Sequence, residues 1–278
     1  MHTGIKPKDD DYDIDVGLKF DIDKKDFDPV EVKKWVKDAL DGHTKSVEIR
    51  RSCVTVTYQK NDEPLYHVDF AVYAANNCDG KMYIAKGKEN SDPDKKIWEV
   101  SCPMDLMDTL RNRFDEADDR KQFRRIIRYM KKWKDTNFTS NGSSAPTGIS
   151  LTVLAFDLFY PKKSRDNIAF KTTYDDFNAL SNFVKDILNR FSYAYRNGEF
   201  CRAISSKLPV EPYNELFEKM TNKQMESFYK KLCDLDSALE EVKKCTKRSE
   251  ACNKLVEVFG DDFPVTADKS TVGTSESA

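Results

Sequence analysis

The sequence predicts an α+β fold, with a mixed sheet and helices in residues 1–103 and a lobe of helices in residues 104–264. In the first stretch, apolar and polar side chains alternate with a period of two, which is typical of strands buried on one face. After residue 103, apolar side chains recur at helical spacing instead. Residues 265–278 are small and polar with neither period, which predicts a disordered C-terminal tail.

The composition of the chain excludes several classes of protein. Its net charge is −2 and its pI is near 6.0, so no overall basic field attracts it to nucleic acid, and we expect no stable nucleic-acid complex. No stretch approaches the roughly 18 uncharged apolar residues of a membrane-spanning helix, so no membrane association is expected. The seven cysteines show no CxxC motif and no zinc-ligand spacing, which indicates reduced thiols and a cytoplasmic protein.

The first predicted strand, residues 11–20, carries two acids on one face. Asp13 and Asp15 are separated by one residue, so both point to the same side of an extended chain. The opposite side is apolar and can lie on a core; it comprises Tyr12, Ile14, Val16, Leu18 and Phe20. Such a pair of carboxylates can hold one hard cation between its oxygens.

A second predicted strand, residues 65–74, supplies a third acid, because Asp69 points away from that strand's apolar face. If the two strands are neighbours on one core, Asp13, Asp15 and Asp69 share one side of the sheet. Two carboxylates about 4 Å apart repel each other by roughly 4 kcal/mol at an effective dielectric constant near 20, and Mg²⁺ would reverse the sign of that interaction. The alternative interpretation is a solvated acidic strand edge beside a turn.

The other elements of the first lobe follow from local signals. Pro29 begins a helix that we expect over residues 29–41, with one apolar stripe. Alternating, β-branched residues predict one long strand over residues 45–58, and turn residues then lead into the strand that carries Asp69. A short strand is expected at residues 81–85, between turn signals.

The helical lobe is predicted from apolar stripes. The expected helices span residues 104–114, 119–135, 149–160, 175–195, 222–244 and 248–259. Gly260 ends the last of them, as a glycine after a helix commonly does. The second helix is unusually basic, with eight Lys or Arg and no acid between Arg120 and Lys134. This run is either a solvated helix face or the binding site of an anionic ligand.

Three stretches carry a family resemblance. Asp13-Ile14-Asp15 with the later Asp69 resembles the carboxylate triad of the polymerase β-like nucleotidyltransferase superfamily. The stretches Asp10–Leu18, Arg128–Trp133 and Phe259–Pro264 together resemble a CD-NTase, a bacterial cyclic-oligonucleotide synthase related to cyclic GMP-AMP synthase. The resemblance implies a nucleotidyltransferase lobe and a helical lobe, with a cleft between them that binds NTPs.

The resemblance also implies roles for single residues. Asp13, Asp15 and Asp69 would be the catalytic residues and the ligands of two Mg²⁺ ions, with Mn²⁺ as a substitute. Lys131 matches a lysine that reaches the triphosphate, and Thr147 matches a phosphate-contacting position, although an ordinary helix N-cap is the other interpretation of Thr147. The product would be a cyclic di- or trinucleotide that activates an effector in anti-phage (CBASS) defence.

Both ends of the chain carry expectations from the same resemblance. The family places a Gly-Ser pair at a helix start before the paired acids, and this sequence has none before Asp13. We therefore expect either a truncated or misassigned start with weak activity, or a real loss of part of the triphosphate site. At the other end, the small residue Ala278 would be a substrate for a ubiquitin-like conjugation enzyme; a frayed terminus is the alternative.

Two other functions remain open at the level of sequence. A polymerising or tRNA-end nucleotidyltransferase would use the same triad, although the net charge of −2 argues against an extended RNA surface. A catalytically dead nucleotide or RNA sensor would explain the absence of Gly-Ser, but the complete set of three acids argues against it.

Overall fold

The computed structural model describes residues 12–44, 46–60, 63–139 and 145–266. These residues form two compact units, and the expected α+β class is confirmed. One unit contains residues 12–109 and the short segment 208–214; the other contains residues 110–207 and 215–266. The sequence-based boundary at residue 103 placed segment 208–214 in the helical lobe, whereas its contacts are with the first unit. Apart from residues 265 and 266, the predicted tail with Ala278 lies outside the described residues.

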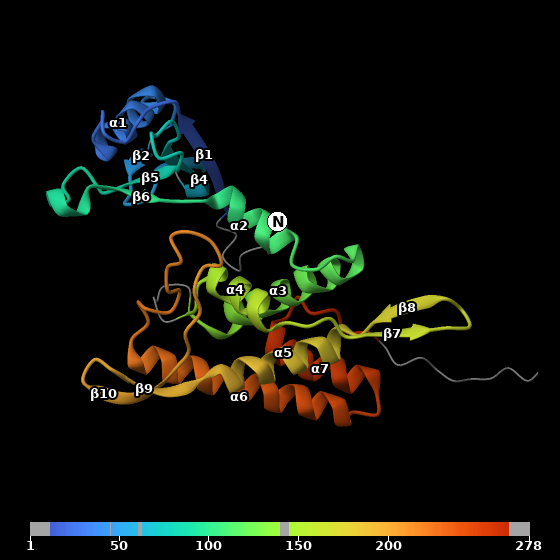
Figure 1. Ribbon diagram of the computed structural model, residues 1–278. Coiled ribbons are helices and arrows are strands. Elements are labelled where there is room, and N and C mark those ends of the chain that lie inside the picture. Colours follow the sequence, from blue (N-terminus) through green and yellow to red (C-terminus); the bar gives the residue numbers. More distant parts are fainter. Residues whose placement is uncertain (1–11, 45, 61–62, 140–144, 267–278) are drawn as a thin grey trace, which may run out of the picture. The chain divides into compact units, whose positions relative to one another are not determined.

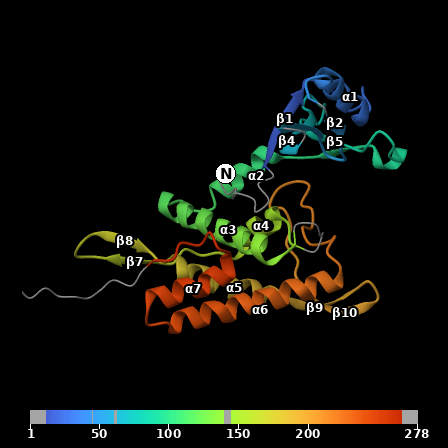
Figure 2. The ribbon, with the colours of Figure 1, turned by 180° about the vertical axis from the view of Figure 1, so that it is seen from behind.

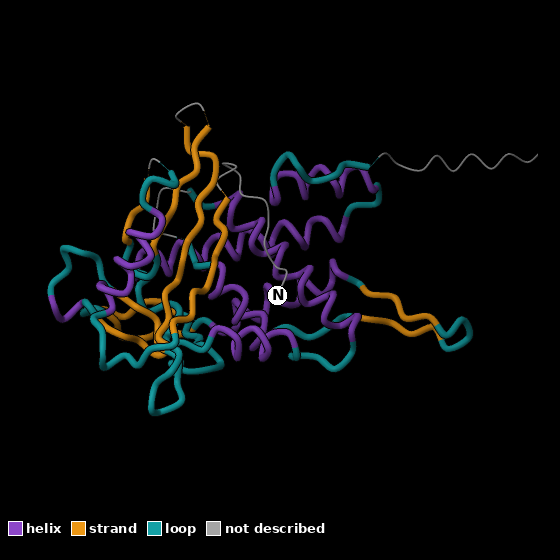
Figure 3. Tube along the Cα trace, turned by 90° about the horizontal axis from the view of Figure 1, so that it is seen from above, coloured by secondary structure: helices purple, strands orange, loops and turns teal. Residues whose placement is uncertain are grey.

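The first unit is built on a mixed sheet (Figure 3). Its described strands are β1 Tyr12–Phe20, β2 Ser46–Ile49, β3 Val54–Lys60, β4 Glu63–Ala74, β5 Tyr83–Lys86 and β6 Ile97–Val100. Strands β2 to β6 follow one another in order as antiparallel neighbours, while β1 pairs with β4 in parallel. A single-turn 3₁₀ helix, Pro93–Lys95, precedes β6.

Helix α1, Pro29–Leu40, covers the apolar face of this sheet. It begins where Asp28 caps its first turn by accepting hydrogen bonds from Val30 N and Glu31 N. The buried core between helix and sheet comprises Val32, Val36, Ile49, Val54, Val72 and Ala85. Leu18, Phe20 and Phe70 pack against it, which confirms the predicted inward faces of the strands that carry the acids.

The prediction of one long strand over residues 45–58 is wrong, because a tight turn at residues 50–53 divides it into β2 and β3. A buried lysine of α1 holds this turn. Lys33 is 0% exposed, and its Nζ donates to Arg50 O (2.9 Å), Arg51 O (3.0 Å) and Gly87 O. Three carbonyls match the three donors of an ammonium group. Burial lowers the pKa of Lys33 to about 8.

The second unit is mainly helical (Figures 1 and 2). Its described helices are α3 Ala117–Asn137, α4 Gly148–Leu158, α5 Asp176–Arg190, α6 Asn222–Lys244 and α7 Arg248–Phe259, while α2, Pro103–Arg111, spans the boundary between the units. Two hairpins, β7 Lys163–Asp166 with β8 Lys171–Tyr174 and β9 Ser192–Arg196 with β10 Glu199–Ala203, were not predicted. No described helix is both long enough and apolar enough to span a bilayer.

The helix predicted over residues 175–195 ends early, at Arg190, and β9 follows. The reason is turn chemistry: Asn197 and Gly198 both have positive φ, at 50° and 87°, which is the geometry of a two-residue hairpin turn. The Asn-Gly pair therefore reverses the chain and pairs β9 with β10. This signal is visible in the sequence and outweighs the helical periodicity that precedes it.

We expect Lys33→Met to destabilise the first unit by about 2–4 kcal/mol, because three buried carbonyls would lose their donor. Chemical denaturation followed by circular dichroism would measure this. Lys34→Met is the matched control, since Lys34 is exposed on the same helix and should tolerate the change. Equal stabilities of the two variants would show that the buried ammonium does not hold the turn.

Candidate active site

The parallel pairing of β1 with β4 brings the acids predicted from sequence to one place. Asp15 is in register with Asp69, and Asp13 is in register with His67. Because paired residues of neighbouring strands point to the same face, all three carboxylates lie on one side of the sheet. The assumption that the two strands are neighbours, on which the sequence argument depended, is therefore confirmed.

The three acids differ in their surroundings. Asp13 and Asp15 are exposed, whereas Asp69 is half-buried because β4 is flanked by strands on both sides. Thr55 of β3 is in register with Asp69, is 1% exposed, and donates its hydroxyl hydrogen to Asp69 Oδ1. This bond takes up one carboxylate oxygen and fixes the direction of the side chain.

Sequence analysis missed Thr55 as a positioning residue. The antiparallel register of β3 with β4 was the signal that could have found it, because it places Thr55 beside Asp69 and Thr57 beside His67. Thr57 Oγ1 and His67 Nδ1 form a hydrogen bond of 3.0 Å. The polar face of the sheet thus carries two hydroxyl groups of β3 next to the acidic strand.

Tyr73 lies on the same face of β4 as His67 and Asp69, because side chains alternate along a strand. Gly17, two residues after Asp15, leaves room for its ring: a Cβ at Gly17 would lie 3.4 Å from Tyr73 Cε2. Burial raises the pKa of Tyr73, a hydrogen bond with Ser101 opposes this, and the negative charge of Asp15 adds to the rise. The aromatic ring therefore lies beside Gly17 and close enough to Asp15 to be influenced by its charge.

The three carboxylates are chemically suitable ligands for a divalent cation. Carboxylate oxygens are the ligands that Mg²⁺ prefers, and three of them lie on adjacent strands. Within the described part of the chain, however, no three His, Cys, Asp or Glu side chains converge closely enough to hold a metal ion. The backbone thus brings Asp13, Asp15 and Asp69 to one face, while their side chains are not gathered around one point.

The second unit contains the other predicted site residues. Lys131 of α3 is half-buried, and its side chain lies against the start of α4: a Cβ at Gly148 would be 3.4 Å from Lys131 Cε and 3.8 Å from its Nζ. Burial and, to a lesser extent, the charge of Lys134 lower the pKa of Lys131. Glycine at position 148 therefore allows the ammonium group to approach the helix N-terminus closely.

Thr147 is the N-cap of α4. Its Oγ1 accepts a hydrogen bond from Ser150 N (3.1 Å), and its carbonyl accepts one from Ser150 Oγ (2.7 Å). The N-cap interpretation is thus confirmed. A hydroxyl that accepts a bond keeps its own hydrogen for a further acceptor, so capping does not exclude contact with a phosphate. The first-turn N–H groups of α4 and the Lys131 ammonium together form an arrangement that favours an anion.

The basic run of α3 does not act as one uniform surface. Arg125 forms two hydrogen bonds with Asp176, and Lys132 pairs with Asp262 (3.0 Å). Arg120 donates to backbone carbonyls at its own end of the helix. These side chains have local partners on different sides of the helix, while Lys131 lies beside the start of α4.

The motif from Phe259 to Pro264 packs the end of α7 onto α3. Gly260 ends the helix with φ of 90°, and a Cβ there would lie 3.3 Å from Thr136 Oγ1. Thr136 donates to Phe259 O (3.0 Å), and Phe259 and Phe263 are stacked with centroids 5.9 Å apart. The motif thereby supports the helix that carries Lys131.

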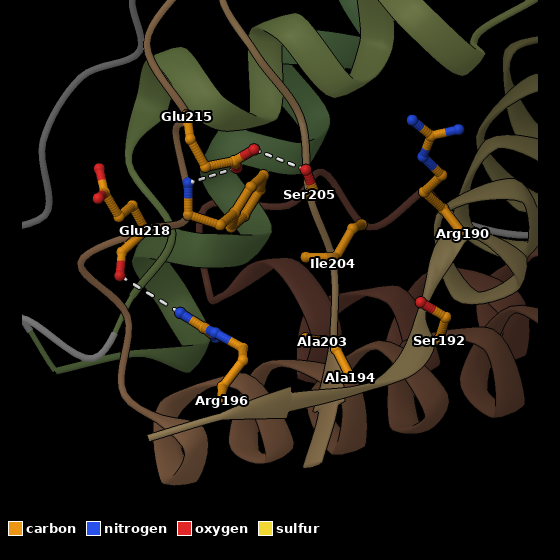
Figure 4. Close-up of a pocket in the computed structure, with 10 residues that line it drawn as sticks. Arg190, Ser192, Ala194, Arg196, Ala203, Ile204, Ser205, Glu215 and Glu218 are labelled. Atoms are coloured by element: carbon orange, nitrogen blue, oxygen red, sulfur yellow. Dashed lines mark hydrogen bonds between the residues drawn. The ribbon is translucent and has the colours of Figure 1, made fainter. Parts of the chain in front are cut away.

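A cavity of about 500 Å³ lies in the same unit, beside the β9–β10 hairpin (Figure 4). Its polar lining includes Arg190, Arg196, Glu215 and Glu218, so two positive and two negative side chains balance. Arg196 is directed to Glu218 O, and Ser205 donates to Glu215 (2.6 Å). None of the residues predicted from sequence lines it, and it is not part of the candidate site.

Comparison with known proteins relates the site to a family. Residues 1–73 match the family described as cyclic GMP-AMP synthase DncV-like, nucleotidyltransferase domain, and this range contains the three acids. The chain is 28% identical, over 166 residues, to a cyclic GMP-AMP synthase from Escherichia albertii. That match takes in 55% of this chain and 34% of the relative, so it spans about a third of the relative's length.

Solved structures give the same fold. The Vibrio cholerae DncV cyclic AMP-GMP synthase in complex with nonhydrolyzable GTP superposes with a TM-score of 0.66 at 18% identity, over 95% of this chain and 66% of that one. The Bradyrhizobium diazoefficiens CD-NTase CdnG in complex with GTP gives 0.65 at 14% identity, over 93% and 78%. Residues 1–73 are therefore similar to a DncV-like nucleotidyltransferase domain, and the chain shares the fold of solved CD-NTases.

Proposed function

We propose that this protein transfers nucleotidyl groups between NTPs and joins them into a cyclic di- or trinucleotide, without a template. The observation that carries the proposal is the register of β1 and β4, which sets Asp15 beside Asp69 with Asp13 two residues away on the same face. Three acids on one face are costly for a sheet that has only a structural role, because like charges repel. A bound cation would offset this repulsion.

Asp13, Asp15 and Asp69 would hold divalent cations, with Mg²⁺ as the expected ion and Mn²⁺ as a substitute. Such ions lower the pKa of an attacking hydroxyl and neutralise a leaving pyrophosphate. The protein's own residues do the positioning. Thr55 fixes one oxygen of Asp69 and leaves the carboxylate a second one for a ligand, and the Tyr73 ring borders Asp15.

Lys131, Thr147 and the N-terminus of α4 would bind the triphosphate. The Lys131 ammonium next to Gly148 adds a full positive charge to the partial charge of the helix end. The Thr147 hydroxyl can donate to a phosphate oxygen while it caps the helix. Binding of this kind is charge stabilisation, which is the main contribution of the protein in phosphoryl transfer.

The remaining parts of the proposal concern the role in the cell. The resemblance to CD-NTases supports a product that activates an effector in anti-phage (CBASS) defence. Priming of the enzyme by a ubiquitin-like conjugation enzyme at Ala278 is part of the same proposal. The related Bradyrhizobium diazoefficiens CdnG structure contains GTP and the Vibrio cholerae DncV structure contains nonhydrolyzable GTP, which supports purine NTPs as substrates here.

Incubation of the protein with labelled NTPs and Mg²⁺, followed by phosphatase and chromatography, tests the reaction. A short phosphatase-resistant product is the expected result, because a cyclic oligonucleotide has no terminal phosphate. A ladder of products would instead indicate a polymerising nucleotidyltransferase, and complete absence of product with Mg²⁺ and with Mn²⁺ would favour a sensor.

We expect Asp69→Asn to reduce product formation by about 100-fold or more, because it removes a metal ligand. Its thermal stability should be unchanged or slightly higher, since one repulsive charge is lost and an amide oxygen can still accept the Thr55 hydrogen bond. Asp38→Asn, at an exposed position of α1, is the matched control. Near wild-type activity of Asp69→Asn would refute the metal assignment.

We expect Lys131→Ala to raise the KM for NTP by about tenfold or more, because a charge-assisted hydrogen bond to phosphate is lost. Lys132→Ala should have little effect, since adjacent residues on a helix point about 100° apart and Lys132 pairs with Asp262 instead. Steady-state kinetics of both variants would measure the difference. Equal losses would mean that the basic run acts as a diffuse field.

A further inference from the structure

The β7–β8 hairpin projects from the helices of the second unit (Figures 1 and 3). Two large apolar residues at its turn are exposed to solvent. Ile168 is 94% exposed and Phe170 is 82% exposed. Single exposed apolar residues are common on proteins, but two large ones at the tip of a projecting hairpin are a typical feature of a contact surface.

The conformation of the tip is held by the hairpin itself. Asp166 Oδ1 accepts hydrogen bonds from Ile168 N (2.8 Å) and Ala169 N (3.0 Å), which closes the turn. Phe170 has φ of 48°, in the left-handed region that favours glycine or asparagine. A bulky aromatic residue is an unfavourable choice for this backbone, so its presence points to a role of the side chain.

The base of the hairpin is anchored to α3. The buried side chain of Gln122 bonds both backbone groups of Lys162, accepting from its N (2.9 Å) and donating to its O (3.2 Å). Asp119 accepts from Lys163 Nζ (2.9 Å) and from Tyr174 OH (2.6 Å). These hydrogen bonds hold the base of the hairpin against α3.

Basic residues outnumber acidic ones in the hairpin, and next to the turn Arg165 and Lys171 stand with one acid, Asp166, which is in register with Lys171. The hairpin segment 162–174 contains four Lys or Arg and one Asp, a net charge of +3 in a chain whose net charge is −2. Lys163 is neutralised by Asp119 and Glu116 at the base. Arg165 and Lys171 lie one step behind the tip, on opposite faces of the hairpin according to the strand register. Cations therefore flank the apolar tip on both sides.

We propose that the β7–β8 hairpin docks the protein on an anionic lipid surface, with Ile168 and Phe170 inserted among the acyl chains and Arg165 and Lys171 at the headgroups. Charge complementarity favours this partner, because anionic headgroups attract nearby Lys and Arg while apolar side chains gain by leaving water. A convex tip also needs no preformed pocket in a fluid bilayer. Such a contact is peripheral and needs no spanning helix, so it departs from the expectation of no membrane association, which was based on the lack of such a helix. It rests on the hairpin alone rather than on the nucleotidyl-transfer proposal.

Sedimentation of the full chain with phospholipid vesicles tests the proposal. Vesicles of phosphatidylcholine with an equimolar amount of phosphatidylglycerol should bind at least about tenfold more protein than phosphatidylcholine alone, because two cations contribute. High salt should reduce this preference, since it screens exposed charges. Equal binding to both kinds of vesicle, or no binding to either, would overturn the proposal. Lack of binding to either would indicate that the partner of the tip is a protein.

Variants separate insertion from a structural role of the tip. Phe170→Gly should lose most of the binding to the mixed vesicles while the protein remains as stable as wild type or more so, since glycine suits the positive φ. Ile168→Ser should also lose binding, and Arg165→Gln with Lys171→Gln should remove the preference for phosphatidylglycerol. Phe200→Ser is the control, because Phe200 is 75% exposed on the other hairpin. Retained binding by Phe170→Gly, or an equal loss in Phe200→Ser, would contradict lipid insertion.

Discussion

The parallel pairing of β1 with β4 is the constraint on which the candidate site depends. Its register is set by burial: Leu18 of β1 and Val72 of β4 are partners on the face covered by α1. Because side chains alternate with a period of two, the register that directs these residues to the core directs Asp15 and Asp69 together to the opposite face. A slip by one residue would reverse both faces, so burial of the core fixes the positions of the acids.

This arrangement has a local cost that the rest of the unit offsets. Like charges in register on neighbouring strands destabilise a sheet, whereas the apolar face beneath them stabilises it. Thr55 reduces the cost by donating to Asp69, and exposure of Asp13 and Asp15 lets water screen their charges. Local sequence choices that oppose stability are characteristic of functional sites, where the cost is compensated elsewhere in the fold.

In the second unit, burial of one face of α3 fixes the direction of the candidate site residue Lys131, as the β1–β4 register fixes the acids. Met130 and Trp133 are almost fully buried, and they fix the rotation of the helix about its axis. Lys131 follows Met130 directly and is thereby directed against the start of α4, while Lys132 is directed to Asp262. The turns of the two hairpins in this unit differ in their residues. Asn-Gly at residues 197–198 follows the expected turn chemistry, whereas Phe170 at the other tip departs from it.

The sequence by itself determined the fold class, most helices, the inward faces of the strands and the three acids, because these depend on periodicity and on local capping and turn signals. It also favoured the N-cap role of Thr147. Tertiary structure decided which strands are neighbours and that Thr55 contacts Asp69. It also decided that Lys33 binds the carbonyls of residues 50, 51 and 87, at the turn that divides a predicted strand. Those contacts join residues that are distant in the chain, and their partners are selected by packing rather than by any local pattern.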